Sequence, residues 1–179
     1  MKSPPWVVIA TCILAGATLK LADQTGEDRH NKAGYLSAAI AGTLLGSIIS
    51  YGPEEASIVI GIIIGVSLAR KIDRPNLLLG LIITVTTAYI LGFETPRLWL
   101  LLLVSALSLV DEFGHDRLGA KTSSLGVFFR YRVSLKVALL FAAAASIVSD
   151  TAAIGFLGFD SAYDATNWLL SRKKKNKVI

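Results

Sequence analysis

Residues 98–121 read LWLLLLVSALSLVDEFGHDRLGAK, an apolar run that leads without interruption into a cluster of charged residues. The run, from Leu98 to Val110, holds no Asp, Glu, Lys or Arg. It therefore suits the hydrocarbon core of a membrane, where charged side chains are costly. The cluster begins at Asp111 and places acidic and basic side chains around Gly114. This pattern predicts a transmembrane helix that carries a polar site at its end.

The same pattern occurs earlier in the chain. LADQTGEDR at residues 21–29 aligns without a gap with LVDEFGHDR at residues 109–117, at an offset of 88 residues. Each copy has the form D-x-x-G-x-D-R and follows an apolar segment. Four predicted spans separate the copies, so both lie on one side of the membrane and form a parallel repeat. The repeat halves are about 5–93 and 98–170, and the matched polar residues are Asp23/Asp111, Asp28/Asp116 and Arg29/Arg117.

Apolar segments recur along the whole chain and predict an all-α, polytopic membrane bundle of about seven helices. Several segments are shorter than a usual span, so their helices should extend into the flanking polar clusters, or the membrane should thin locally. The last one contains two acids and could instead be a re-entrant piece with an interfacial helix. The segments are Pro5–Leu19, Tyr35–Tyr51, Ala56–Ala69, Leu77–Phe93, Leu98–Val110, Val133–Val148 and Thr151–Leu170.

Composition agrees with a membrane protein. The 179 residues are 53% hydrophobic and only 17% charged, whereas a soluble domain must expose many more polar side chains. The net charge of +5 resides largely at segment ends and in the tail 172–179, which suits anionic lipid headgroups better than nucleic acid. The single cysteine, Cys12, excludes an internal disulfide. The oligomeric state is left open.

Loop charges predict the orientation. Basic residues gather in the loops around 20–32, 70–74 and 117–132 and in the tail, while the alternate loops are acidic or neutral. The positive-inside rule then places the N-terminus outside and both motifs and the C-terminus in the cytoplasm. We expect the first segment to be a retained helix rather than a cleaved signal peptide, because it runs directly into the first motif.

The chemistry of the repeat follows from its carboxylates. Asp23 and Asp28 would not align on a regular helix, so Gly26 and Gly114 predict a break that lets the chain fold back. Acidic groups gathered there would repel one another unless a cation is bound. Carboxylate oxygens suit Mg²⁺, often together with substrate phosphates. The alternative is an ordinary juxtamembrane loop in which aspartates pair with arginines and cap helices.

The motifs resemble those of the UbiA superfamily of intramembrane prenyltransferases. DEFGHDRLGAKT at residues 111–122 is similar to that family's D-x-x-G-D-R-x-x-G-x-K-T, with one extra residue at His115. Residues 23–32 are similar to the end of N-D-x-x-D-x-x-x-D-R-x-N-K, without its leading Asn-Asp. RKIDRPN at residues 70–76 looks like the family's basic loop. The family usually has nine helices and nearly twice this length.

The resemblance implies a Mg²⁺-dependent enzyme that transfers a prenyl group from an isoprenyl diphosphate to a lipid or aromatic acceptor. The implied metal ligands are Asp23, Asp28, Asp111 and Asp116. The implied diphosphate-binding residues are Arg29, Lys71, Arg74, Arg117 and Lys121, and the implied catalytic residues are Asp111, Asp116 and Lys121.

Other interpretations remain open. Repeated acidic sites also suit a small cation transporter or channel, and a scaffold without a ligand would pair each motif with its own arginine. His30 and His115 would be the residues of a transition-metal site. Asp160 and Asp164 are interpreted as hydrated acids of an interfacial segment.

Overall fold

The computed structural model describes residues 3–26, 31–119, 121 and 123–176, with side chains as far as Arg172. Within these ranges the protein is entirely helical and has eight helices and no strand, which confirms the all-α fold class. The helices are α1 (Pro5–Thr25), α2 (Lys32–Ile49), α3 (Pro53–Leu68), α4 (Pro75–Leu91), α5 (Leu98–Leu118), α6 (Ser124–Arg130), α7 (Val133–Ala144) and α8 (Asp150–Asn176).

Each apolar segment of the sequence corresponds to one helix, and α6 is the helix that hydropathy does not predict. The expected extension into polar clusters is confirmed: α1 continues past Leu19 to Thr25, and α5 continues past Val110 to Leu118. The alternative of a divided last segment is wrong, because α8 is one helix of 27 residues.

Local signals explain where several helices begin. Pro5, Pro53 and Pro75 stand at the first turn of α1, α3 and α4, where the missing N–H of proline costs nothing. The side chains of Asn31 and Ser123 accept backbone N–H groups at the starts of α2 and α6, which satisfies donors that have no partner within the helix.

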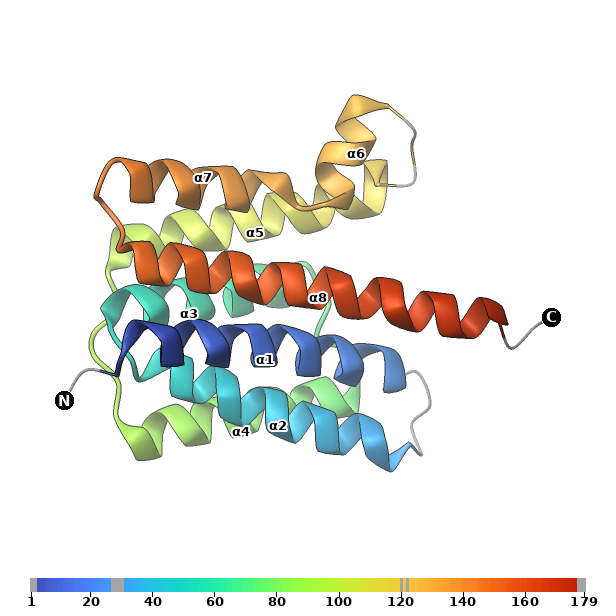
Figure 1. Ribbon diagram of the computed structural model, residues 1–179, viewed down its shortest axis with the longest axis horizontal. Helices are drawn as coiled ribbons and strands as arrows, with labels where there is room; N and C mark the ends of the chain where they lie inside the picture. Colours follow the sequence, from blue (N-terminus) through green and yellow to red (C-terminus); the bar gives the residue numbers. More distant parts are fainter. Residues whose placement is uncertain (1–2, 27–30, 120, 122, 177–179) are drawn as a thin grey trace.

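Figure 1 shows α1 to α5, α7 and α8 running along the long axis of the molecule, with the two termini at opposite ends. α1, α3 and α5 finish at the end from which α8 projects, and we call this end the motif end (Figure 1). α2, α4 and α7 begin there. Both copies of the motif are therefore located at the same end of the bundle.

Within the described part of the chain, three helices are long and apolar enough to cross a membrane: α1, α2 and α5. α4 and α7 are also apolar but shorter. Large hydrophobic side chains are exposed on the outside of the bundle, among them Ile82, Tyr89 and Phe141. Such a surface suits lipid rather than water, so a membrane protein is the plausible class.

Small residues allow the helices to approach closely. A Cβ atom at Gly16 of α1 would overlap the backbone of Phe159 in α8, and one at Gly42 of α2 would overlap the backbone of Gly80 in α4. At both positions a larger residue would force the helices apart.

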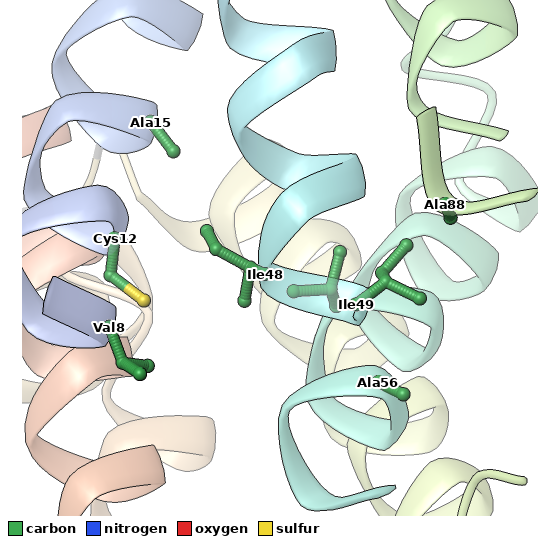
Figure 2. Close-up of a cluster of buried hydrophobic side chains, with 8 residues drawn as sticks. Val8, Cys12, Ala15, Ile48, Ile49, Ala56 and Ala88 are labelled. Carbon is green, nitrogen blue, oxygen red and sulfur yellow. The ribbon is translucent and has the colours of Figure 1, made fainter. Parts of the chain in front are cut away.

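Two clusters of buried apolar side chains hold the bundle together toward the end opposite the motifs. One lies between α1, α2, α3 and α4 and contains Val8, Cys12 and Ile48. Figure 2 shows Val8 and Cys12 pointing from α1 toward Ile48. The other joins α3, α5, α7 and α8 around Val104 and Leu139. The polar groups of the motif end thus rest on a mainly apolar core.

Candidate functional site

The two motif copies differ in the helix that carries them. α1 ends at its C-cap, Gly26, as the expected break requires. α5 continues through Gly114 as regular helix to Leu118, so the prediction of a break at Gly114 is wrong. A Cβ at Gly114 would overlap the ring of Phe129 in α6. The glycine therefore provides room for a packed aromatic ring rather than a turn.

Asp23, in the last turn of α1, is held by two cations and one hydroxyl, which come from α1, the loop before α4, and α8. Its Oδ2 lies 2.8 Å from Nζ of Lys20, and its Oδ1 lies 3.3 Å from Nη1 of Arg74. The hydroxyl of Tyr163 in α8 donates to Oδ2 at 3.4 Å. The Asp23 side chain is still 30% exposed, so its carboxylate can be reached from outside the bundle.

Asp111, the equivalent residue of the second copy, has a different environment. It is 1% exposed, and its carboxylate accepts hydrogen bonds from the backbone N–H groups of Ser134 at 3.3 Å and Leu135 at 3.0 Å. These groups belong to the first turn of α7, where a negative charge is favoured by the helix dipole. Asp111 thus caps α7 from a neighbouring helix.

Glu112 supplies the carboxylate that faces cations at the second copy. Its Oε1 lies 2.8 Å from Nε of Arg132, and its Oε2 lies 3.9 Å from Nζ of Lys71. Burial disfavours the charge of Arg132, but the carboxylate of Glu112 outweighs that effect and holds the pKa of Arg132 above its ordinary value. Arg132 is therefore charged throughout the physiological pH range.

The basic loop between α3 and α4 links the two copies. Lys71 donates to Oδ1 of Asp116 in the second copy at 2.6 Å, while Arg74 pairs with Asp23 in the first. Arg70, which precedes them, has a left-handed backbone with φ of 58°, a conformation that turns the chain sharply. One short loop thus places a cation against each acidic site.

A third charged group lies on α7 and α8. Nζ of Lys136 is 2.5 Å from Oδ2 of Asp160 and 3.7 Å from Oδ2 of Asp164. Asp160 is only 8% exposed, so its interpretation as a hydrated interfacial acid is wrong. The ring of Tyr163 packs against Lys20 and Arg132, and it connects this group with both motif copies.

These groups surround one cavity of about 930 Å³ that extends deep into the bundle. At the motif end its walls include Asp23, Glu112 and Arg74, and farther in they include Cys12 and Ile48. Among the charged residues in its walls are Lys20, Asp23, Arg70, Lys71, Asp73, Arg74, Asp111, Glu112, Arg130, Arg132, Asp160 and Asp164. Most of these charges lie at the motif end, but Asp160 lies partway along the cavity and Glu55, in the first turn of α3, lines its far end, where the other lining side chains are mainly apolar.

Several of the expected site residues do not line the cavity. Asp116 is bound by Lys71, Arg117 lies over the ring of Phe113, and Lys121 is exposed, with its carbonyl oxygen accepting from Arg130. Asp28 and Arg29 lie outside the described residues. Asp23, Asp111, Lys71 and Arg74 do line the cavity, as expected of a shared site.

Sequence patterns did not identify Glu112, Arg132, Lys136 or Tyr163 as site residues. Glu112 stands next to Asp111, so the sequence DE at the end of an apolar helix is the signal that would have found it. The other three are single polar residues whose partners are far away in the chain. Their roles become visible only once α7 and α8 are packed against α1 and α5.

Among the described residues, no group of three or more His, Cys, Asp or Glu side chains is gathered closely enough to hold a metal ion by itself. His115, which lines the cavity, lies 3.7 Å from Asp116, and His30 lies outside the described residues. A site for Mg²⁺ must therefore rely on one or two carboxylates and on ligands that arrive with the substrate.

Comparisons with models of protein families, with curated proteins and with solved structures found no significant match to this chain.

Proposed function

We propose that this protein is an intramembrane prenyltransferase similar to the UbiA superfamily, which transfers a prenyl group from an isoprenyl diphosphate to a lipid or aromatic acceptor. One observation carries the proposal. A continuous cavity joins Asp23, Glu112 and the basic loop at the motif end to mainly apolar walls deeper in the bundle. An isoprenyl diphosphate has the same division, with a charged head and an apolar tail.

In this proposal α1 to α5, α7 and α8 cross the membrane, and the chain consists of two parallel repeats. α1 and α5 run in the same direction and carry their motif copies to the same end (Figure 1). α3 has 16 residues and α7 has 12, so these spans require a locally thinner bilayer. The positive-inside rule places the motif end in the cytoplasm.

The carboxylates of Asp23 and Glu112 are the groups best placed to hold Mg²⁺. Each lies in the cavity wall beside cations that could exchange their partner for a phosphate. Mg²⁺ is commonly bound by one or two carboxylates together with phosphate oxygens, so the donors fit a metal that enters with the diphosphate. Bound there, Mg²⁺ would neutralise charge on the departing diphosphate. Asp111 would support this site by fixing α7, and Asp116 would contribute from the rim.

Lys71 and Arg74 are the proposed diphosphate-binding residues. Both line the cavity, and both now neutralise motif carboxylates. A diphosphate with Mg²⁺ would replace those contacts, with the metal facing the acids and the phosphate oxygens facing the cations. The basic loop would then connect both motif copies through the substrate. Arg117 and Lys121 would have to move to reach it.

The proposal is tested with purified protein in lipid nanodiscs. Asp23→Asn and Glu112→Gln should each weaken Mg²⁺-dependent binding of geranylgeranyl thiodiphosphate about tenfold or more, because each removes a charge that faces the metal. Glu94→Gln, at an exposed position near the opposite end, is the matched control and should bind normally. Unchanged binding in both site variants, with normal thermal unfolding, would disprove the assignment.

A cation transporter is the second candidate, and Asp160 is the observation that favours it. Asp160 stands ten residues into α8, about 15 Å from its start, and is buried beside Lys136. Buried acids near the middle of a membrane often mark ion paths. Liposomes separate the two functions: a transporter gives Mg²⁺ or proton flux, and the proposed enzyme gives none.

The ligand-free scaffold has less support. It requires each motif to pair with its own arginine, yet Asp23 and Asp116 pair with Arg74 and Lys71 from a separate loop. Arg117 of the second motif lies over an aromatic ring instead. The motif carboxylates are thus tied to a loop that could release them.

A further inference from the structure

We infer that the apolar part of the cavity selects the length of the isoprenoid tail and accepts about four isoprene units, with Val8 and Ile48 near its floor. This inference rests on the proposed function, since it names the substrate of the same site. It concerns the end of the cavity farthest from the motif end, which the chemistry of diphosphate binding does not involve.

The residues on one face of α1 give the length of the cavity. Val8, Cys12, Leu19 and Asp23 all line it, and their spacings of four, seven and four residues keep them on the same side of a helix. Fifteen residues separate Val8 from Asp23, a rise of about 22 Å. The cavity therefore follows α1 over most of its length.

The residues of α8 and α3 that line the cavity indicate a similar length. On α8 the cavity extends from Ala152 and Phe156 up to Tyr163 and beyond. On α3 it extends from Glu55 to Val66. The walls thus belong to several helices at matching depths, and below the motif end they are mainly apolar, with Asp160 and Glu55 as the charged exceptions.

The far end of the cavity is closed by packed side chains. Val8 is 4% exposed and Ile48 is 3% exposed, and both belong to the buried cluster between α1, α2, α3 and α4 (Figure 2). Next to them the hydroxyls of Thr11 and Tyr51 are hydrogen-bonded at 3.2 Å between α1 and the end of α2. A tail that reached this point would have to displace this core, at the cost of overpacking.

The length of the occupant follows from these limits. An isoprene unit adds four chain carbons, which span about 5 Å when extended, given a carbon–carbon bond of about 1.5 Å. A pocket of about 22 Å therefore holds about four units. A tail of six units would extend about 8 Å past Val8, so it would be excluded or bound in a folded state with lower affinity.

The experiment introduces a larger side chain, called a plug below, at each of two depths in the cavity, where it would block a longer isoprenoid tail. Cys12 lies eleven residues from Asp23, about 16 Å from the motif end, so Cys12→Phe should exclude tails of four units and retain those of two. Val8→Phe lies deeper and should weaken four units while retaining three. Leu14→Phe is the matched control, because Leu14 is 55% exposed and is not part of the cavity wall.

Binding of prenyl thiodiphosphates with two, three, four and six units is measured in nanodiscs with Mg²⁺. We expect the unmodified protein to bind the four-unit compound most tightly, and Cys12→Phe to weaken that binding about tenfold or more with little change for two units. Retained binding of the two-unit compound also shows that the variant is folded. Cys12→Leu, a smaller plug, should give an intermediate loss.

The remaining outcomes distinguish a failure of the length selection from a failure of the proposed function. If all four tails bind equally and the plugs have no effect, the length selection is wrong while the diphosphate site stands. If hexadecyl phosphate competes as well as the four-unit compound, the pocket does not recognise an isoprenoid and the inference fails. If none of the thiodiphosphates binds, the proposed function fails as well.

Discussion

The two motif copies carry the same aspartates at the ends of α1 and α5, but the two helices use them differently. α1 ends at Gly26 and leaves the Asp23 side chain 30% exposed. α5 continues through its motif and buries Asp111 to 1% exposure against the start of α7. A duplicated motif can thus provide an accessible carboxylate in one copy and a structural one in the other.

The difference extends to the neighbouring ion pairs. At the second copy, Glu112 has a side chain 6% exposed and pairs with Arg132. At the first copy, both Asp23 and Arg74 are about one-third exposed. Water can replace a lost partner at the first copy but has little access to the second. The comparison therefore predicts that the second copy contributes more to the stability of the fold and that the carboxylate of the first copy is the more easily reached by ligands.

The largest effect is expected from the buried pair. Arg132→Met leaves the buried carboxylate of Glu112 without its nearest cation, and should lower the free energy of unfolding by about 3 kcal/mol. Arg74→Met breaks a more exposed pair and should cost less than about 1 kcal/mol. Unfolding in detergent, followed by circular dichroism, measures both. Equal losses for the two variants would contradict the proposed division.

The matched aspartates give the second comparison. Asp111→Ala removes an acceptor from two backbone N–H groups of α7 and should cost about 2 kcal/mol. Asp111→Asn keeps an acceptor and should recover part of that loss. Asp23→Ala should cost less than about 1 kcal/mol but reduce binding of the thiodiphosphate strongly. If Asp23→Ala proves the less stable protein, the assignment of roles to the two copies is reversed.

Hydropathy predicted the positions of the long helices because an apolar run reports directly on burial or contact with lipid. It missed α6, whose seven residues, SLGVFFR, are too few for a periodic signal. The cap at Ser123 was the available clue. The apolar runs end before α1 and α5 do, and the expected extension into the polar clusters is found because polar residues can continue a helix that is already established.

The candidate site was only partly predictable. Asp23, Asp111, Lys71 and Arg74 were found because their motifs or their basic loop repeat or cluster in the sequence, and all four line the cavity. The contact of Tyr163 with Asp23 joins residues 140 positions apart. Such pairs depend on how helices pack, and a single sequence holds no local signal for them.

The smallest expected change in stability comes from replacing the two motif glycines, Gly26 and Gly114, and it distinguishes their roles. Gly114→Ala places a methyl group against the ring of Phe129, and Gly26→Ala places one against the side chain of Asn76. Phe129 belongs to the short helix α6, which can shift, so Gly114→Ala should cost only about 1 kcal/mol. Adding Phe129→Leu should restore most of that loss by removing the obstructing ring. Thermal unfolding of the single and double variants measures the recovery.

Gly26→Ala should not be restored in the same way. Asn76 is 2% exposed, and its side chain donates to the carbonyl of Ala22 at 2.7 Å. Truncating Asn76 to make room would leave that carbonyl without its side-chain donor, so Gly26→Ala with Asn76→Ala should be less stable than Gly26→Ala alone. Recovery at both glycines would mean that each only makes room for a neighbour. Recovery at Gly114 alone would mean that Gly26 allows Asn76 to hold the end of α1 by a hydrogen bond. Gly114 would then only provide space for the ring of Phe129.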